Sequence, residues 1–278
     1  MERQIWCDDG LIAAEDLRIS PFDRGLTVGL GLFETILAVN GRPVFLERHL
    51  ARHRVGCGRL GWEMPVLEKV AVAIRTVVEA NGLSAGRARV RLFQTAGEGG
   101  LDDCAAGLYR KFLVSAVPAA PALENVSVTF SKWPRNERSA LAGLKCASYA
   151  ENLLALAEAR RQGYDEVYFL TTRGDVCETA TANLFVVKGG RITTPPLAAG
   201  CLPGVTRGWL LESGPELGLE VSEDRVTRND LLDADEVFLT SATRGPVPVS
   251  RLDGREYGPA PASARCREAW EQAVQRKD

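Results

Sequence analysis

Apolar residues recur along this chain with two different spacings, and the spacing separates the predicted helices from the predicted strands. Residues 66–81 have apolar side chains at helical spacing and are followed by Gly82, a frequent helix stop. Residues 88–94 instead alternate between apolar and polar side chains, which is the period of a strand. The other elements predicted from such patterns are helices over 47–57, from Gly204 to Leu217 and over 261–276, and strands over 33–39, 112–117, 126–130, 166–170 and 236–240.

Short turns join several of these strands. Asn40-Gly41 is a strong two-residue hairpin signal, and Gly189-Gly190 marks a second hairpin. A third hairpin is predicted near the N-terminus, with its turn at residues 8–10. Strands and helices alternate, but the hairpins favour an α+β fold with antiparallel or mixed sheets over a doubly wound parallel sheet.

The length of 278 residues is enough for two ordinary domains, each with its own core. Residues 118–122 are small and punctuated by prolines, which is typical of a linker. The sequence therefore predicts a small N-terminal α/β domain over 1–117, a linker over 118–123 and a larger C-terminal domain over 124–278.

Composition and charge exclude several classes of partner. The formal net charge of −2 gives no electrostatic reason to expect nucleic acid or an anionic membrane. No run of about 18 apolar residues occurs, and residues 1–10 lack the apolar core of a signal peptide, so no membrane span is expected.

The cysteines and histidines limit the chemistry further. Seven cysteines are scattered, and none forms a Cys-x-x-Cys pair, which indicates reduced thiols in the cytoplasm and neither a zinc site nor a disulfide framework. His49 and His53 are the only histidines, so a mechanism with several imidazoles is excluded, and a hydrolase with a Ser/His/Asp or Cys/His site is disfavoured.

Two residues between positions 145 and 183 attract attention as a reactive pair. Lys145 lies just before an amphipathic helix, and Glu178 lies just after a hairpin. A lysine in an apolar setting can act as a nucleophile towards a carbonyl, and a carboxylate can keep a pyridinium nitrogen protonated. Taken alone, however, each is more often a solvated surface residue.

Two further features suit a phosphate group. The guanidinium of Arg52 has the geometry of a bidentate phosphate ligand. Residues 204–206 begin a helix after Pro203, and the free N–H groups of a helix N-terminus bind phosphate well. An amine, a partner for a ring nitrogen and two phosphate-binding elements are together the groups that pyridoxal phosphate requires.

The same residues belong to a longer series of segments. In chain order these are Asp23–Thr35, His49–Arg52, Lys145 with Tyr149 and Asn152, Glu178 with Asn183, Leu202–Arg207, and Ala234–Ser241 leading to Pro248. This series resembles the class IV aminotransferase family, the fold-type IV pyridoxal-phosphate enzymes, which includes branched-chain and D-amino-acid aminotransferases and 4-amino-4-deoxychorismate lyase. The resemblance covers nearly the whole chain, from about Asp8 to Asp253.

The resemblance implies a role for each matching residue. Lys145 forms a Schiff base with pyridoxal 5'-phosphate and moves the Cα proton, Glu178 pairs with the pyridine nitrogen, and Tyr149 hydrogen-bonds the phenolic oxygen. The phosphate ligands it implies are Arg52, Val205, Thr206, Ser241 and Ala242. It also implies a two-domain enzyme with the cofactor in the cleft between the domains, and a homodimer.

The chain departs from the family where relatives contact the substrate. Val28 and Leu30 replace the usual Tyr and Asp, which predicts a more apolar pocket. Arg91 and Arg244 are candidate substrate ligands, although a solvated loop arginine is an equally good description of Arg244. The segment 95–101 and the absence of a hydroxyl at Ala242 resemble the lyase.

The interpretation that the whole pattern favours is a transaminase that moves an amino group between a small amino acid or amine and a 2-oxo acid. The alternative is 4-amino-4-deoxychorismate lyase, which releases pyruvate and 4-aminobenzoate. A more remote alternative is a non-catalytic binding protein on the same scaffold, against which the intact pair of Lys145 and Glu178 argues.

Overall fold

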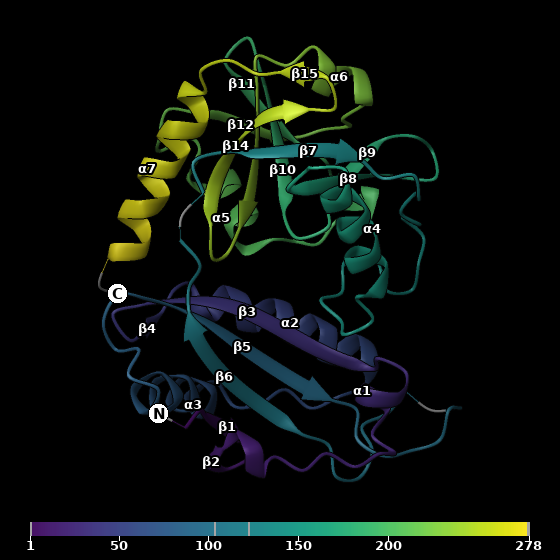
Figure 1. Ribbon diagram of the computed structural model, residues 1–278, viewed down its shortest axis with the longest axis vertical. Coiled ribbons are helices and arrows are strands. Elements are labelled where there is room, and N and C mark those ends of the chain that lie inside the picture. The colour runs from purple at the N-terminus through teal and green to yellow at the C-terminus, as the bar shows by residue number, and fades with distance from the viewer. Residues whose placement is uncertain (1, 103, 122, 277–278) are drawn as a thin grey trace. The chain divides into compact units, whose positions relative to one another are not determined.

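The computed structural model describes residues 2–102, 104–121 and 123–276. The chain forms two compact units (Figure 1). Unit 1 contains Met1–Pro121 and Leu144–Tyr149, and unit 2 contains Ala122–Gly143 and Ala150–Asp278. Among the described residues, no helix has both the length and the apolar character needed to cross a bilayer.

The segment Leu144–Tyr149 returns to unit 1, whereas the predicted boundaries placed it among residues 124–278. Backbone pairing explains the return: Phe33 N donates to Lys145 O at 3.0 Å, and Ala147 N donates to Gly31 O at 2.8 Å. Lys145 therefore belongs to unit 1, although it follows the predicted linker in the chain.

Unit 1 is built on a sheet with the strand order β2-β1-β6-β5-β3-β4, in which neighbouring strands run antiparallel. The strands are β1 (Gln4–Cys7), β2 (Gly10–Ala13), β3 (Gly31–Val39), β4 (Arg42–Pro43), β5 (Arg87–Thr95) and β6 (Phe112–Pro118). The helices are α1 (Arg24–Thr27), α2 (Leu46–Leu60) and α3 (Leu67–Ala80), with a short 3-10 turn at Ala14–Asp16. The last residue of β6, Pro118, is the first residue of the predicted linker.

Almost every residue of the strand β3 is buried, and since successive side chains point to opposite sides of a sheet, both of its faces are covered. Ile36 and Ala38 on one face join the core with Ile74 and Val77 of α3, while α2 packs along the same strand (Figure 1). Phe33, one residue from Glu34, points to the opposite face. The two faces of β3 thus offer two different environments to neighbouring residues.

The predicted turns and helices of unit 1 are confirmed. Asn40 and Gly41 have positive φ values of 48° and 78°, as a tight hairpin turn requires, and Val39 pairs with Arg42. The helix α2 is longer than the predicted 47–57 because it continues until Gly61, whose left-handed φ of 70° ends it.

Unit 2 contains a mixed sheet with the strand order β12-β11-β10-β13-β14-β7-β8-β9, and β15 pairs with β14. Its strands are β7 (Val126–Phe130), β8 (Glu166–Leu170), β9 (Val176–Thr179), β10 (Asn183–Lys188), β11 (Arg191–Thr194), β12 (Glu220–Glu223), β13 (Glu236–Ser241), β14 (Gly245–Leu252) and β15 (Arg255–Glu256). The pairs β7–β8, β7–β14 and β11–β12 are parallel, and the other pairs are antiparallel. The predicted α+β fold with mixed and antiparallel sheets is confirmed.

The helices of unit 2 are α4 (Ala150–Arg161), α5 (Val205–Ser213), α6 (Arg228–Leu232) and α7 (Pro261–Gln275), with a 3-10 turn at Leu197–Ala199. The helix α5 ends at Ser213, short of the predicted Leu217, and Pro215 supplies the reason because it lacks the N–H that the next turn needs. The helix α7 packs beside β14 (Figure 1).

Candidate active site

Lys145 lies in an extended segment of unit 1, several residues before α4 begins at Ala150. The backbone of its neighbour Cys146 forms an antiparallel β-bridge with that of Leu32, and this pairing fixes the segment against the start of β3. The Nζ atom of Lys145 lies 4.6 Å from the centroid of the Phe33 ring, and Phe33 is only 3% exposed. Lys145 is therefore not the solvated surface lysine that its sequence position alone favours.

The ring of Phe33 also contacts two other predicted site residues. The guanidinium carbon of Arg91 lies 3.4 Å from the ring centroid, and the Tyr149 ring packs edge-on at 5.6 Å. Arg91 also donates to Thr35 Oγ1 at 3.2 Å. Contacts between a cation and an aromatic face are worth about 0.5–2 kcal/mol, the larger value applying when the pair is desolvated. Phe33, which sequence reasoning did not select, brings together Lys145, Arg91 and Tyr149.

The surroundings of the Arg91 guanidinium affect its pKa, although the residue as a whole is exposed. Desolvation lowers the pKa of its guanidinium to about 10, the nearby Tyr149 opposes this shift, and the positive charge of Arg89 adds to it. Arg91 nevertheless stays protonated at neutral pH. It presents a partly desolvated positive charge on the same ring as the amine of Lys145, which suits a ligand carrying a carboxylate.

Arg52 is held by a buried carboxylate on the other face of β3. Its Nε and Nη2 atoms donate to Glu34 at 2.9 Å and 2.5 Å, and His49 Nδ1 lies 2.7 Å from the same carboxylate. Burial alone raises the pKa of Glu34, but the charge of Arg52 and the hydrogen bonds from His49 and Arg52 outweigh it and hold the pKa far below its usual value. Glu34 thus stays ionised and fixes the orientation of the Arg52 guanidinium.

Glu34 and His49 were not predicted as site residues. The available signal is the spacing of His49 and Arg52, which lie three positions apart on α2 and therefore on one helix face. Burial lowers the pKa of His49 against the opposing effect of Glu34, so this imidazole is neutral and donates through Nδ1.

The predicted substrate residues Val28 and Leu30 lie in the loop after α1. This loop contacts the segment that carries Lys145, because Ser148 Oγ donates to Gly29 O at 3.1 Å. Gly29 has a φ of 68°, and a Cβ atom there would lie 3.0 Å from Ser148 Oγ. Val28 is 51% exposed, whereas Leu30 packs partly against the core.

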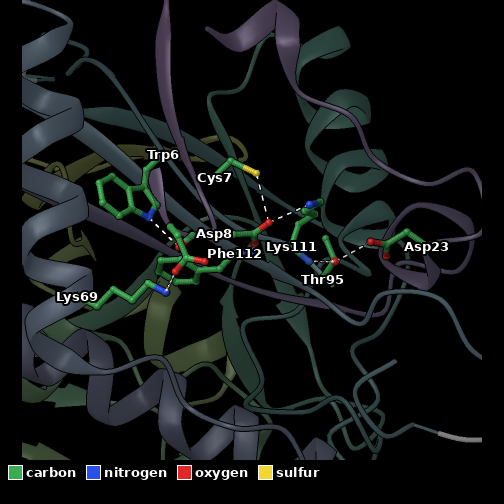
Figure 2. A network of polar contacts seen from close by, with 9 residues as sticks. Trp6, Cys7, Asp8, Asp23, Lys69, Thr95, Lys111 and Phe112 are labelled. Atoms are coloured by element: carbon green, nitrogen blue, oxygen red, sulfur yellow. Dashed lines mark hydrogen bonds and ion pairs between the residues drawn. The ribbon is translucent and has the colours of Figure 1, made fainter. Parts of the chain in front are cut away.

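A network of polar contacts anchors α1 within unit 1 (Figure 2). Asp23 caps α1 by accepting from Gly25 N at 2.7 Å, and Thr95 Oγ1 donates to the same carboxylate at 2.6 Å. Thr95 Oγ1 in turn accepts from Lys111 N, and Lys111 Nζ pairs with Asp8 at 2.8 Å. The N-terminal hairpin, β5 and the loop that carries Val28 are thereby connected.

In unit 2, Glu178 on β9 is held by the backbone that leads into α5. Leu202 N donates to Glu178 Oε2 at 2.9 Å, and Asn183 Nδ2 donates to Leu202 O at 2.9 Å. Asn152 Nδ2 donates to Ala180 O at 2.7 Å and so ties α4 to the residues that follow Glu178. Glu178 is half-buried and its position is coupled to the start of α5.

The N-terminus of α5 offers donors suited to an anion. The first N–H groups of a helix have no intrahelical acceptor, and no side chain caps α5 at Gly204. A Cβ atom at Gly204 would lie 1.9 Å from Asn183 Oδ1, so a larger residue there would have to displace the Asn183 amide. Thr206 Oγ1 donates to Ser241 O at 3.1 Å, which brings the turn with Ala242 next to this helix start.

The two groups of residues fit the parts of pyridoxal phosphate. Unit 1 supplies an amine on an aromatic ring, a phenol and a fixed guanidinium, in Lys145, Tyr149 and Arg52. Unit 2 supplies a carboxylate joined through a few backbone atoms to an uncapped helix N-terminus, which matches a ring nitrogen and a phosphate.

Known proteins resemble this chain both in sequence and in fold. Residues 31–252 match the family model described as amino-transferase class IV. A putative branched-chain-amino-acid aminotransferase of Methanocaldococcus jannaschii is 31% identical, over 91% of this chain and 88% of the relative. The aminodeoxychorismate lyase of Bacillus subtilis is 30% identical, again over 91% of this chain and 88% of the relative.

A solved structure supports the same assignment. The branched-chain aminotransferase of the thermophilic archaeon Thermoproteus uzoniensis, crystallised with norvaline, superposes with a TM-score of 0.90 at 27% identity and covers 99% of this chain and 95% of that chain. The family model and these relatives extend over both units. The chain is therefore an enzyme of the class IV aminotransferase family.

Proposed function

We propose that this protein binds pyridoxal 5'-phosphate and transfers an amino group between a small amino acid or amine and a 2-oxo acid. The observation that carries the proposal is the ring of Phe33, which holds the amine of Lys145 and the guanidinium of Arg91. A substrate carboxylate paired with Arg91 would place its Cα atom beside an amine able to remove and return a proton.

The residues around this pair divide the remaining work. Lys145 would hold the cofactor through Nζ until a substrate amine displaces it, and the freed amine would then move the proton at the substrate Cα. Glu178 keeps the ring nitrogen protonated, and Tyr149 donates to the phenolic oxygen. The phosphate is held by Arg52, the N-terminus of α5 at Val205 and Thr206, and the turn at Ser241 and Ala242. When bound, the protonated ring of the cofactor supplies an electron sink.

A second candidate is 4-amino-4-deoxychorismate lyase chemistry at the same site. Two observations favour it: Ala242 brings no hydroxyl to the phosphate turn, and a lyase is among the relatives at 30% identity. The lyase needs the same binding and proton transfer, followed by loss of pyruvate, so the residues assigned above do not separate the two reactions. The products do.

A homodimer in the cytoplasm completes the proposal. Exposed apolar side chains gather on unit 1 where residues 23, 98 and 108 are joined by backbone bridges; they are Phe22, Leu26, Leu101, Leu108 and Tyr109. Apolar patches of this kind often mark contacts between subunits. The seven scattered cysteines, none of them in a Cys-x-x-Cys pair, favour a reducing compartment.

The test begins with cofactor uptake. Apo protein is titrated with pyridoxal phosphate, reduced with borohydride and digested, and the modified peptide is located by mass spectrometry. We expect the adduct on Lys145, its loss in Lys145→Ala, and its retention in Lys188→Ala, a control at an exposed lysine of β10. A wild-type protein that takes up no cofactor would contradict the proposal.

The reaction is then read from the cofactor spectrum. Single amino acids and amines are added to the holoenzyme, and a transaminase converts the cofactor to its amine form with at least one donor. Failure with every donor, together with pyruvate and 4-aminobenzoate from 4-amino-4-deoxychorismate, would establish the lyase instead.

A further inference from the structure

Arg244 lies in the turn between β13 and β14 and has three polar partners inside unit 2. Its Nε donates to Ser241 Oγ at 3.2 Å, and its Nη2 donates to Thr181 Oγ1 at 2.7 Å and to Glu166 Oε1 at 3.2 Å. The Thr181 hydroxyl donates to the same oxygen of Glu166. Two segments distant in the sequence from Arg244, at Glu166 and Thr181, therefore meet the β13–β14 turn at one guanidinium.

Glu166 makes this contact costly to remove. Its side chain is 3% exposed, against 23% for Arg244, and its second oxygen, Oε2, is buried without a hydrogen-bond partner among the described residues. A carboxylate withdrawn from water depends on its counter-charge, and losing one member of such a pair leaves the other buried and uncompensated. Arg244 is the cation paired with Glu166, so its guanidinium is already engaged.

The joined segments are the ones assigned to the cofactor. Ser241 belongs to the phosphate turn and accepts from Thr206 of α5 through its carbonyl. Thr181 lies in the loop that follows Glu178, where Asn152 holds the neighbouring Ala180. Arg244 thus connects the turn beside the phosphate donors with the loop behind the ring-nitrogen carboxylate.

We infer that Arg244 is a positioning residue, which fixes the turn at Ser241–Ala242 against the loop after Glu178 through its pair with Glu166. The inference rests on the proposed function, because it concerns the binding of the same cofactor. It replaces the role of substrate-carboxylate ligand that the sequence suggested, and the two roles predict different measurements. A substrate ligand changes KM, whereas a positioning residue changes cofactor affinity and the rigidity of the two segments.

The experiment uses Arg244→Ala, with Arg244→Lys and Thr181→Val as graded variants. Arg228→Ala is the matched control, because Arg228 also pairs with an acid, Asp253 at 3.5 Å, and stacks on an aromatic ring, Phe130. The first readout is the dissociation constant for pyridoxal phosphate, and the second is amide hydrogen exchange of residues 178–183 and 239–246 in the apo protein.

We expect Arg244→Ala to weaken cofactor binding by about 10-fold or more, since it removes hydrogen bonds to a charged partner. Exchange in both segments should accelerate. Arg244→Lys should recover part of each effect, Thr181→Val should act in the same direction but less, and Arg228→Ala should match the wild type. If Arg244→Ala does not fold, Thr181→Val still tests the link while keeping the ion pair.

Each contrary result points to a different failure. Wild-type cofactor affinity and exchange in Arg244→Ala, with a raised KM for carboxylate substrates, would overturn the inference and restore the substrate role. A wild-type protein that binds no pyridoxal phosphate would overturn the proposed function, while the exchange measurement would still report whether Arg244 joins the two segments.

Discussion

Glu34 in unit 1 supports a proposed cofactor ligand, Arg52, whereas Glu178 in unit 2 is itself a proposed ligand, and the two carboxylates are held by different contacts. Glu34 is fully buried, and Arg52 and His49 surround it. Glu178 is half-buried, and the backbone N–H of Leu202 positions it. The ion pair with Arg52 makes Glu34 a residue that orients another side chain, whereas the hydrogen bond from Leu202 N fixes where the carboxylate of Glu178 itself lies. Predictions for the two residues should therefore differ in kind.

The largest expected effect is on activity, in Glu178→Gln. The amide oxygen still accepts from Leu202 N, so the fold should be kept, but a neutral side chain no longer holds the ring nitrogen protonated. We expect the turnover of the half-reaction to fall by about 100-fold or more, while the free energy of unfolding stays near that of the wild type. Single-turnover spectra and denaturant unfolding provide the two measurements.

Glu34→Gln should give the reverse pattern. Removing one charge leaves the Arg52 guanidinium, whose side chain is only 9% exposed, without its counter-charge. The free energy of unfolding should fall by about 3 kcal/mol or more, measured by urea denaturation of the apo protein. A stable variant with unaltered cofactor affinity would show that Arg52 does not depend on Glu34.

The lowered pKa values of Glu34 and His49 predict how stability depends on pH. The lowered pKa of Glu34 means that its contribution is complete above the unfolded carboxyl pKa of about 4.3 and is lost as the pH falls further. The lowered pKa of His49 has the same sign, since below about 6.5 the unfolded chain takes up a proton that the buried imidazole does not. Stability should fall on acidification through both ranges, and Glu34→Gln should flatten the more acidic part. If the free energy of unfolding depends on pH equally in the wild type and in Glu34→Gln, Glu34 does not contribute in this way.

The sequence predicted the local elements of the fold better than the long-range contacts that position the site residues. The hairpin at Asn40-Gly41, the helix start at Gly204 and the α+β class follow from local chemistry, which the folded chain keeps. The placement of Lys145 over Phe33 does not, because it depends on the return of residues 144–149 to the edge of β3. Long-range pairing of that kind leaves no periodic signal in either segment.

The ion pairs escape prediction for a related reason. Glu34 is a polar residue in an apolar strand, and only the packing of α2 shows that it faces His49 and Arg52. Glu166 and Arg244 are far apart in the chain and meet because β8 and the β13–β14 turn reach the same part of unit 2. Without that contact, the sequence offered for Arg244 only the roles of a substrate ligand or of a solvated loop arginine.

The smallest expected effect comes from Phe33→Leu, one residue from Glu34 on the opposite face of β3. The ion pair of Arg52 should be untouched, while Lys145 and Arg91 lose the aromatic face that both contact. Because such contacts contribute about 1 kcal/mol, KM for a carboxylate substrate should rise roughly 3- to 10-fold, measured by steady-state kinetics. Phe238→Leu, at an equally buried ring of β13, separates lost packing from lost cation contacts. We expect both variants to lose stability alike and only Phe33→Leu to raise KM. That result would show that two neighbouring residues of β3 have separate roles: Glu34 fixes a phosphate ligand, and Phe33 fixes a substrate ligand.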